Sequence, residues 1–314
     1  MRILFTGASS FTGYWIAREL ASAGHEVVAA LRGHPARYEG VRAERIRRLA
    51  PHVELVPGAP FGSEDFVALA GRGPWDLLCH HGACVDGYRS PDFNVLAAVE
   101  QNTRNLEGVL SVLVAQSVRG VVLTGTVFEP DEGAGTEPRR AFSPYGLSKG
   151  MTGQVFAYRA AVAGVPLSKF VIPNPFGPFE DARFCAYLVE SWMRGETPTV
   201  RTPRYVRDNI HVSLLARCYA RLVASFGTPD PMPRLAPSGY VESQGDFARR
   251  VSREIGPRLG LAAPLACIEQ TEFDEPAVRT NTDRVPGAEL GWDQSAAWDG
   301  MAEFYRSRMA AGRA

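Results

Sequence analysis

Lysine is almost absent from this sequence. The chain has 314 residues with 34 Lys and Arg together, and only Lys149 and Lys169 are lysines. Arg therefore occupies nearly every position at which any positively charged side chain would serve. A position that keeps Lys uses what Arg lacks, a compact ammonium with several donors on a flexible stem. Lys149, at the end of the segment Tyr145-Gly146-Leu147-Ser148-Lys149, is thus the first residue to which we assign a chemical role.

The chain also has no excess of positive or negative charge. The formal net charge is +0, which gives no reason to expect binding to nucleic acid or to an anionic membrane surface. No apolar run approaches the length that spans a bilayer. The first residues have the pattern of a strand and not of a signal peptide. We expect no nucleic-acid partner and no membrane partner.

The five cysteines form no CxxC pair, and their number is odd. Free thiols of this kind are typical of a reducing compartment, so we expect a cytoplasmic protein. Cys79 and Cys84 lie near His80 and His81, a combination of residues that can bind a metal. Because Cys79 ends an apolar run, we interpret it as a buried thiol and predict no metal site.

Short apolar strands alternate with helical stretches through the first half of the chain. This alternation predicts an α/β fold, a doubly wound parallel sheet of the Rossmann type with covering helices. The predicted strands are Arg2–Thr6, Glu26–Leu31, Val53–Pro57, Asp76–His80, Gly120–Thr124 and Leu167–Ile172. The predicted helices include Phe11–Ala23, Pro91–Gln116, which we expect to be the longest, and Pro144–Ala163.

The sequence pattern changes after Pro173. Pro and Gly cluster at 173–178 and 227–237, and strand signals become sparse. We predict a smaller, mainly helical lobe here, with excursions back to the sheet. The expected domains are residues 1–172 and residues 173–314.

A glycine-containing loop joins the first strand to the first helix, with the sequence Thr6-Gly7-Ala8-Ser9-Ser10-Phe11-Thr12-Gly13. Gly7 and Gly13 permit a tight turn, and a helix N-terminus at this place binds the pyrophosphate of a dinucleotide. Ser10 replaces the glycine that is usual between them, and its hydroxyl can donate to a phosphate. A plain strand-to-helix turn is the alternative. The predicted cofactor contacts come from Gly7, Ser9, Ser10, Phe11, Thr12 and Gly13.

The end of the second strand bears on the choice of cofactor. NAD enzymes usually carry a carboxylate there for the ribose hydroxyls, whereas this chain continues Ala30-Leu31-Arg32-Gly33-His34, without an acid. Arg32 can pair with a 2′-phosphate, so we expect NADP(H) to be preferred, with NAD(H) possible. The alternative is a solvated Arg at a strand end.

Tyr145 and Lys149 lie four residues apart, so they share one face of the predicted helix Pro144–Ala163. A nearby ammonium favours the ionised form of a phenol. Such a tyrosine can exchange a proton with a sugar hydroxyl or a ketone. The alternative is a chance pair, because this spacing of Tyr and Lys is common.

Together these segments resemble the extended short-chain dehydrogenase/reductase family, and within it the nucleotide-sugar epimerase, dehydratase and reductase group. The resemblance covers nearly the whole chain. Besides the loop and the Tyr145–Lys149 pair, it rests on the segments Asp76–Ala83 (DLLCHHGA), Asn102 in QNTRNL, Leu123–Phe128 (LTGTVF), Pro173–Pro178 (PNPFGP) and Arg207–Val212 (RDNIHV).

The resemblance implies catalytic roles for three residues. Tyr145 would donate or accept the proton, Lys149 would bind the nicotinamide ribose, and Thr124 would hydrogen-bond the reacting sugar oxygen. His80 and Gly82 would lie beside the cofactor.

The remaining matches imply binding roles. Asn102 and Pro173 would also lie near the cofactor, and we expect His81, like His80, to pack and not to catalyse. Asn174 and Arg207 would bind the diphosphate of a nucleotide sugar, with Arg279 as a second clamp. For Arg207 the alternative is a surface ion pair with Asp208.

Departures from the family pattern reduce the number of reactions that we expect this chain to catalyse. Dehydratases of this group carry Asp-Glu after the catalytic Thr, but this chain has Gly125 and Thr126, so 4,6-dehydration is not expected. The resemblance therefore implies an NADPH-dependent reductase of a nucleotide-linked 4-keto-6-deoxy sugar. An NAD-dependent nucleotide-sugar C4 epimerase is the alternative, and a non-catalytic dinucleotide sensor is a third interpretation. The resemblance favours a homodimer formed by the helices predicted at 91–116 and 144–163.

Overall fold

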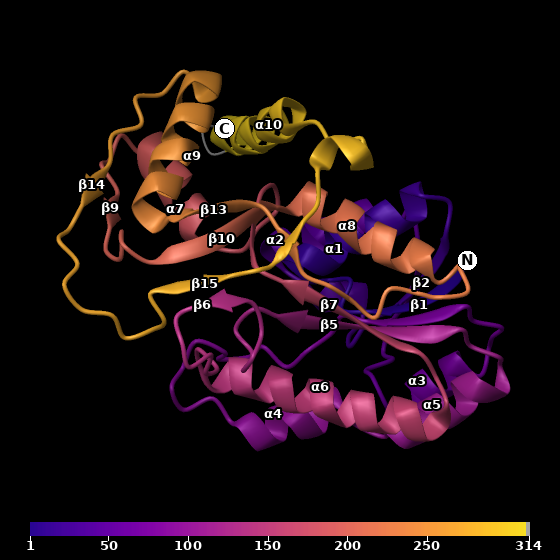
Figure 1. Ribbon diagram of the computed structural model, residues 1–314. Helices are drawn as coiled ribbons and strands as arrows, with labels where there is room; N and C mark the ends of the chain where they lie inside the picture. Colours follow the sequence, from indigo (N-terminus) through magenta and orange to yellow (C-terminus); the bar gives the residue numbers. More distant parts are fainter. Residues whose placement is uncertain (312–314) are drawn as a thin grey trace. The chain divides into compact units, whose positions relative to one another are not determined.

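The structure is a computed structural model that describes residues 1–311 (Figure 1). The chain forms two compact units. Unit 1 comprises residues 1–132, 140–172 and 216–236, and unit 2 comprises residues 133–139, 173–215 and 237 onward. The last three residues of the lobe predicted at 173–314 lie outside the described part of the chain.

Unit 1 is built on a sheet of seven parallel strands in the order β11-β7-β5-β4-β1-β2-β3. The strands are β1 (Arg2–Thr6), β2 (Glu26–Ala30), β3 (Glu54–Val56), β4 (Leu77–His80), β5 (Gly120–Thr126), β7 (Leu167–Ile172) and β11 (Arg234–Leu235). The Rossmann-type α/β fold predicted from the sequence is confirmed. β11 returns to this sheet from the second half of the chain.

Helices cover both faces of this sheet (Figure 1). One face carries α1 (Phe11–Ser22), α2 (Gly40–Leu49) and α8 (Val212–Ser225), of which residues 216–225 belong to unit 1. The other face carries α3 (Glu64–Ala70), α4 (Val95–Asn102), α5 (Leu106–Ala115) and α6 (Pro144–Ala163). A 3₁₀ turn, η1 (Pro35–Arg37), precedes α2. Within residues 1–311, no helix combines the length and the apolar composition that crossing a membrane requires.

The main core of unit 1 lies between the sheet and the helices α3, α5 and α6. Leu4, Leu78 and Val121 on three adjacent strands pack there with Val109 of α5 and Phe156 of α6, and all five are fully buried. Strands in the middle of a parallel sheet are covered on both faces, which explains why they are nearly continuous apolar runs in the sequence.

Both ends of α6 are capped. Ser143 Oγ accepts from Gly146 N (3.3 Å), and Pro144 occupies the first turn, where its missing N–H costs nothing. Gly164 ends the helix in the left-handed conformation, at φ 67°. With 20 residues, α6 is the longest helix in the described part of the chain.

The long helix predicted at 91–116 is wrong. The structure has two helices there, α4 and α5, because Asn105 adopts φ 47° and interrupts the α-helical path. Asn tolerates this left-handed conformation better than most residues do. The apolar periodicity continues across the break, which is why the pattern alone predicted one helix.

Unit 2 combines helices with small sheets. Its helices are α7 (Phe184–Met193), α9 (Gln244–Leu259) and α10 (Gln294–Ala311), with the 3₁₀ turn η2 (Gly287–Leu290). The largest sheet has the order β13 (Tyr240–Ser243), β10 (Val206–His211), β15 (Val278–Thr280) and β6 (Ala134–Gly135), and β8 (Asn174–Phe176) also pairs with β10. Two short pairs are β12 (Pro237–Ser238) with β16 (Asp283–Arg284) and β9 (Thr199–Val200) with β14 (Ala266–Cys267).

Aromatic side chains form the centre of unit 2. The ring of Phe176 lies 5.3 Å from His211, 6.1 Å from Tyr240, 5.1 Å from Phe247 and 5.2 Å from Trp298, measured between centroids.

Truncating a buried Phe to Ala costs about 3–5 kcal/mol. We expect Phe176→Ala to lower the free energy of unfolding by this amount in urea titrations.

Phe273→Ala is the matched control, because this Phe of unit 2 is 38% exposed. It should lower the free energy of unfolding by much less, about 1 kcal/mol or below. Equal losses in the two variants would contradict a core centred on Phe176.

Candidate active site

One serine side chain closes the loop between β1 and α1. Ser10 is the N-cap of α1, and its Oγ accepts from Gly13 N (3.0 Å) and lies 2.8 Å from Gly7 O, to which it donates. The hydroxyl proton is therefore directed to the backbone of the loop itself and not to a phosphate. Ser10 thus supplies the turn geometry that a glycine would otherwise permit.

Gly7 and Gly13 occupy positions where no side chain fits. A Cβ on Gly13 would lie 2.1 Å from Gly7 O, and Gly7 has φ 82° with its Cβ position 2.7 Å from Gly82 N. Gly82 N in turn donates to Thr6 Oγ1 (3.0 Å), so the loop lies directly against the end of β4. Because the first N–H groups of an α-helix have no partner within the helix, this geometry fits a dinucleotide pyrophosphate at the start of α1.

A residue that the sequence reasoning missed supports the same loop. Arg45 of α2 is 1% exposed, and its Nη1 donates to Ser9 O (3.3 Å). It is one of five arginines in the segment 37–48, so nothing in the sequence distinguishes it. Only packing selects this arginine as the one that contacts the loop.

The end of β2 differs in one respect from the sequence interpretation. Leu31 is buried and Arg32 is half exposed, but Asp86 from the loop after β4 lies 3.9 Å from Arg32 Nη1. The carboxylate missing from β2 is thus supplied from a distant segment. A long, exposed ion pair of this kind contributes little, so Arg32 remains able to bind a phosphate.

His80 is part of the packing of the sheet end. Its Nδ1 lies 3.0 Å from Thr6 Oγ1, and its ring lies between Phe61 (4.1 Å) and Phe156 (5.0 Å). Burial lowers the pKa of His80 to about 3, and the charge of Lys149 lowers it further. The ring is therefore neutral near pH 7.

His81 links two of the predicted site residues. Its Nε2 lies 3.0 Å from Thr12 Oγ1 in the cofactor loop, and its Nδ1 lies 3.1 Å from Thr124 Oγ1 at the end of β5. The ring stacks on Phe5, and burial lowers its pKa to about 3, with a smaller effect from Lys149. The sequence predicted only packing for His81, because the two hydroxyl partners come from other strands and loops.

Tyr145 and Lys149 both lie near the start of α6. The ring of Tyr145 is partly exposed and meets Tyr88 and Phe93 edge-on, at 5.4 Å and 6.1 Å between centroids. Lys149 is buried, and its Nζ donates to the carbonyl of Thr124 (2.7 Å). The lysine thus connects α6 to the end of β5.

Burial lowers the pKa of Lys149 from 10.5 to about 8, whereas the nearby carboxylate of Glu129 raises it and Lys169 lowers it. The ammonium is therefore charged at neutral pH but loses its proton only slightly above it. A cation of this kind beside a tyrosine favours ionisation of the phenol.

Both polar atoms of the Asn102 side-chain amide form hydrogen bonds within the protein. Its Oδ1 accepts from Cys84 N (2.7 Å) and its Nδ2 donates to Thr152 Oγ1 of α6 (3.2 Å). The side chain therefore fixes the loop after β4 against α6. The role of Asn102 near the cofactor stays a prediction.

In unit 2, Arg207 and Arg279 are in register on the adjacent parallel strands β10 and β15, so both side chains emerge on the same face. Both are buried. Arg207 donates to Glu275 Oε2 (3.0 Å) and to the carbonyl of Pro276 (2.9 Å). The register therefore places two arginine side chains on one face of this sheet, and Glu275 pairs with the first of them.

The surface ion pair considered between Arg207 and Asp208 is wrong. Neighbouring residues of a strand face opposite sides, and Asp208 accepts from Gly239 N (2.7 Å) and Asn281 N (3.1 Å). Asp208 therefore ties β10 to two other segments of unit 2.

Pro173 and Asn174 begin unit 2 directly after β7. Pro173 is buried. Asn174 lies on β8, in register with Asn209 of β10, and its Nδ2 is buried without a hydrogen-bond partner among the described residues. A buried donor of this kind is costly unless a ligand or water satisfies it, which fits a binding role.

Comparisons with known proteins agree on the family. The model of the NAD dependent epimerase/dehydratase family matches residues 3–231. A comparison with curated protein sequences finds no significant match.

Solved structures share the fold over nearly the whole chain. A UDP-glucose 4-epimerase from Thermotoga maritima has 18% identity and a TM-score of 0.73, covering 98% of this chain and 100% of its own. A UDP-glucuronic acid 4-epimerase from Bacillus cereus has 16% identity and a TM-score of 0.74, covering 98% and 99%. A dTDP-glucose 4,6-dehydratase from Streptomyces venezuelae has 19% identity and a TM-score of 0.70, covering 99% and 98%.

The family match covers well over half of the chain and includes the loop before α1, the end of β5 and the Tyr145–Lys149 pair. The chain therefore belongs to the NAD-dependent epimerase/dehydratase family and is an NAD(P)-dependent enzyme of the extended short-chain dehydrogenase/reductase type.

Proposed function

We propose that this enzyme reduces the ketone of a nucleotide-linked 4-keto-6-deoxy sugar with NADPH. The observation that carries the proposal is the end of β2, where Leu31 replaces the usual acid and Arg32 is half exposed. An acid at this place would repel a 2′-phosphate, whereas Arg32 attracts it.

The chain's own residues supply the proton chemistry. When bound, NADPH provides the hydride for the keto carbon. Tyr145 donates its hydroxyl proton to the oxygen of that carbon, as a general acid. Lys149, fixed on the carbonyl of Thr124, favours the tyrosinate that remains. The hydroxyl of Thr124, oriented by His81, is the second donor to the sugar oxygen.

Unit 2 would recognise the substrate through its diphosphate. Arg207 and Arg279 lie in register on adjacent strands, and guanidinium binds phosphate oxygens through paired hydrogen bonds. The present partner of Arg207, Glu275, has a side chain that is 49% exposed, so a diphosphate can replace it. Asn174, whose Nδ2 has no hydrogen-bond partner within residues 1–311, is the third proposed contact.

A C4 epimerase that uses NAD is the second candidate. The observation in its favour is Asp86, whose carboxylate lies 3.9 Å from Arg32. From this position the Asp86 carboxylate can accept hydrogen bonds from the ribose hydroxyls, as the acid of a typical NAD enzyme does. Reduction and epimerisation differ in whether the oxidised cofactor leaves the enzyme.

We also propose a homodimer, formed through α4 and α6. Both helices carry exposed apolar side chains: Leu96 is 70% exposed, Tyr158 65% and Val162 66%. Contact with a second copy would remove this apolar surface from water.

The cytoplasmic location stays a prediction from the odd number of cysteines, all five of which are free thiols.

The first prediction concerns the cofactor loop. In Gly13→Ala the new Cβ would lie 2.1 Å from Gly7 O, so the loop has to open. Overpacking of this kind costs about 1–3 kcal/mol, and we expect affinity for NADPH to fall roughly 10- to 100-fold in calorimetric titrations. Gly300→Ala is the control, because a Cβ at Gly300 meets nothing within 4 Å. Parent-like affinity in Gly13→Ala would remove the loop from the cofactor site.

The second prediction concerns the proton donor. Tyr145→Phe removes the hydroxyl and keeps the ring, so turnover should fall about 10²- to 10⁴-fold. The melting temperature and NADPH affinity should stay at parent values. Tyr158→Phe, on the same helix but 65% exposed, should retain full turnover. Near-normal turnover in Tyr145→Phe would exclude this tyrosine as the acid.

The third prediction concerns the choice of cofactor. A charge-assisted hydrogen bond contributes about 1.5–3 kcal/mol, so Arg32 should give a roughly 10- to 100-fold preference for NADPH in kcat/KM. Leu31→Asp combined with Arg32→Asn should reverse that preference. If the parent uses both cofactors equally, or retains NAD through purification, the epimerase becomes the better assignment.

A further inference from the structure

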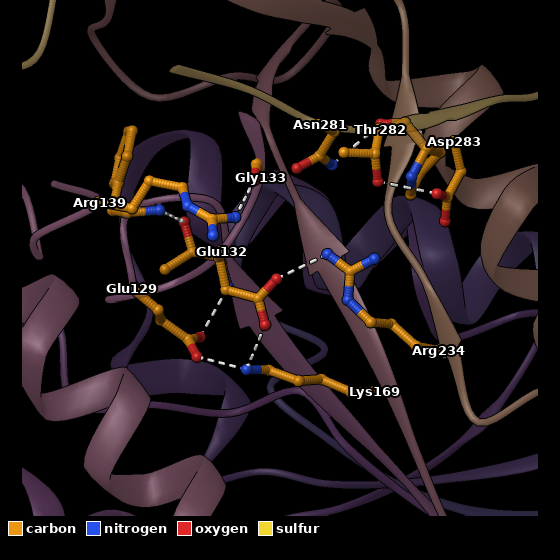
Figure 2. Close-up of polar contacts among 12 residues, drawn as sticks. Glu129, Glu132, Gly133, Arg139, Lys169, Arg234, Asn281, Thr282 and Asp283 are labelled. Carbon is orange, nitrogen blue, oxygen red and sulfur yellow. Dashed lines mark hydrogen bonds and ion pairs between the residues drawn. The ribbon is translucent and has the colours of Figure 1, made fainter. Parts of the chain in front are cut away.

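Four charged side chains of unit 1 form one cluster beside β5 (Figure 2). Lys169 Nζ lies 2.6 Å from Glu129 Oε2 and 2.7 Å from Glu132 Oε1, and Arg234 Nη2 lies 2.7 Å from Glu132 Oε2. Lys169 is the only lysine of the chain besides Lys149. The cluster contains two positive and two negative charges, so it is neutral as a whole.

Glu129 is the most deeply buried member. Its side chain is 1% exposed, compared with 11% for Glu132 and 25% for Lys169. Burial of an unpaired carboxylate is strongly unfavourable, and the ammonium of Lys169 offsets this cost. The proposed reaction uses none of these three groups.

Glycines provide the space for the Glu129–Lys169 pair. A Cβ on Gly125 would lie 2.7 Å from Glu129 Oε1 and 2.7 Å from Lys169 Cε. On α6, one turn beyond Lys149, the Cβ position of Gly153 is at ordinary contact distance from both members of the pair, 3.6 Å from Lys169 Nζ and 3.9 Å from Glu129 Oε2. The pair therefore fills the space between the end of β5 and the helix that carries Tyr145 and Lys149.

The end of β5 is bound at two points on either side of Gly125. Lys149 Nζ donates to the carbonyl of Thr124 (2.7 Å), and Thr126 N donates to Glu129 Oε1 (2.8 Å). The backbone of Thr124, a proposed catalytic residue, is thus fixed by Lys149 directly and by Glu129 two residues further on.

Few charges face Lys149 near neutral pH. His80 and His81 at the end of β4 are neutral, because burial lowers the pKa of each to about 3. From α4, Asn102 contacts α6 through an uncharged amide. On α6 itself the titratable neighbour is Tyr145, one turn earlier. The charged groups that act on Lys149 are the anion Glu129, which raises its pKa, and the cation Lys169, which lowers it.

We propose that Glu129 is a positioning residue of the active site: its carboxylate, fixed by Lys169, holds the end of β5 at Thr126 and supplies the negative charge that keeps Lys149 protonated. The catalytic part of this inference rests on the proposed function, because the proposed reaction requires a protonated Lys149. In this role Glu129 acts through the end of β5 and through Lys149. Glu132 and Arg234 serve to orient Lys169.

Direct titration of the two lysines tests the proposal. Protein labelled with ¹³C at lysine Cε gives two lysine signals, because the chain has two lysines. Lys169→Met removes one signal and assigns the other. In the parent, one signal should titrate near pH 8 and the other above pH 10.5. In Glu129→Gln, which keeps an acceptor for Thr126 N, the midpoint of Lys149 should fall by about one pH unit.

Glu132→Gln is the matched control, because both carboxylates contact the same ammonium. The midpoint of Lys169 should fall in both variants, whereas the midpoint of Lys149 should fall in Glu129→Gln alone. A midpoint of Lys149 that stays at the parent value in Glu129→Gln, or that falls equally in both variants, would overturn the proposal.

Lys169→Met tests the same charge balance if Glu129→Gln does not fold. This variant removes the cation that opposes protonation of Lys149, while the Glu129 carboxylate keeps its hydrogen bond from Thr126 N, so the midpoint of Lys149 should rise above that of the parent. An unchanged or lower midpoint in Lys169→Met would contradict the proposal.

Activity gives the catalytic readout. If charged Lys149 is required, kcat/KM falls as pH rises through the pKa of Lys149, and this alkaline limb should move to lower pH in Glu129→Gln and not in Glu132→Gln. A shifted lysine signal with an unshifted limb would overturn the link to catalysis. Absence of turnover in the parent with keto sugars and NADPH would refute the proposed function, while the lysine titrations still decide the role of Glu129.

Discussion

The buried ammonium of Lys149 is the constraint on which the rest of the candidate site depends. A cation removed from water needs hydrogen-bond acceptors and compensating charge. The carbonyl of Thr124 supplies the acceptor, at 2.7 Å. That single contact connects α6, which carries the proposed acid Tyr145, to the end of β5. The neighbouring histidines stay neutral, so they add no competing charge.

The two lysines of the chain lie in one region of unit 1, and both act on β5. The space around Lys169 is narrow, because the position of a Cβ on Gly125 is 2.7 Å from its Cε. A compact ammonium on a thin stem fits there, whereas the planar guanidinium of Arg is bulkier. In a sequence that otherwise uses Arg, this local geometry gives a physical reason for keeping Lys at position 169.

The fold illustrates which signals are local. α6 begins and ends at its predicted residues, since Ser143, Pro144 and Gly164 determine both ends through local geometry. The buried strands of unit 1 were found because burial on both faces leaves a continuous apolar run. The break at Asn105 was missed, because one residue in the left-handed conformation leaves the apolar periodicity intact.

The sheet of unit 2 was missed for a different reason. Unit 2 does have α7, α9 and α10, but its largest sheet is made of strands of two to six residues. Strands this short carry little periodicity, and β6 and β8 pair with partners that lie far away in the sequence. Their pairing depends on contacts that no local window contains.

The sequence by itself determined the motifs whose parts are close together in the chain: the loop Thr6–Gly13, the pair Tyr145–Lys149 and the alternation that builds the Rossmann-type sheet. Tertiary structure alone decided which distant groups meet at these motifs. It brought Asp86 to Arg32, placed His81 between two threonine hydroxyls and set Glu129 against α6, the helix that carries Lys149. Charges and hydrogen bonds act over a few ångströms of space, whatever the separation of the residues along the chain.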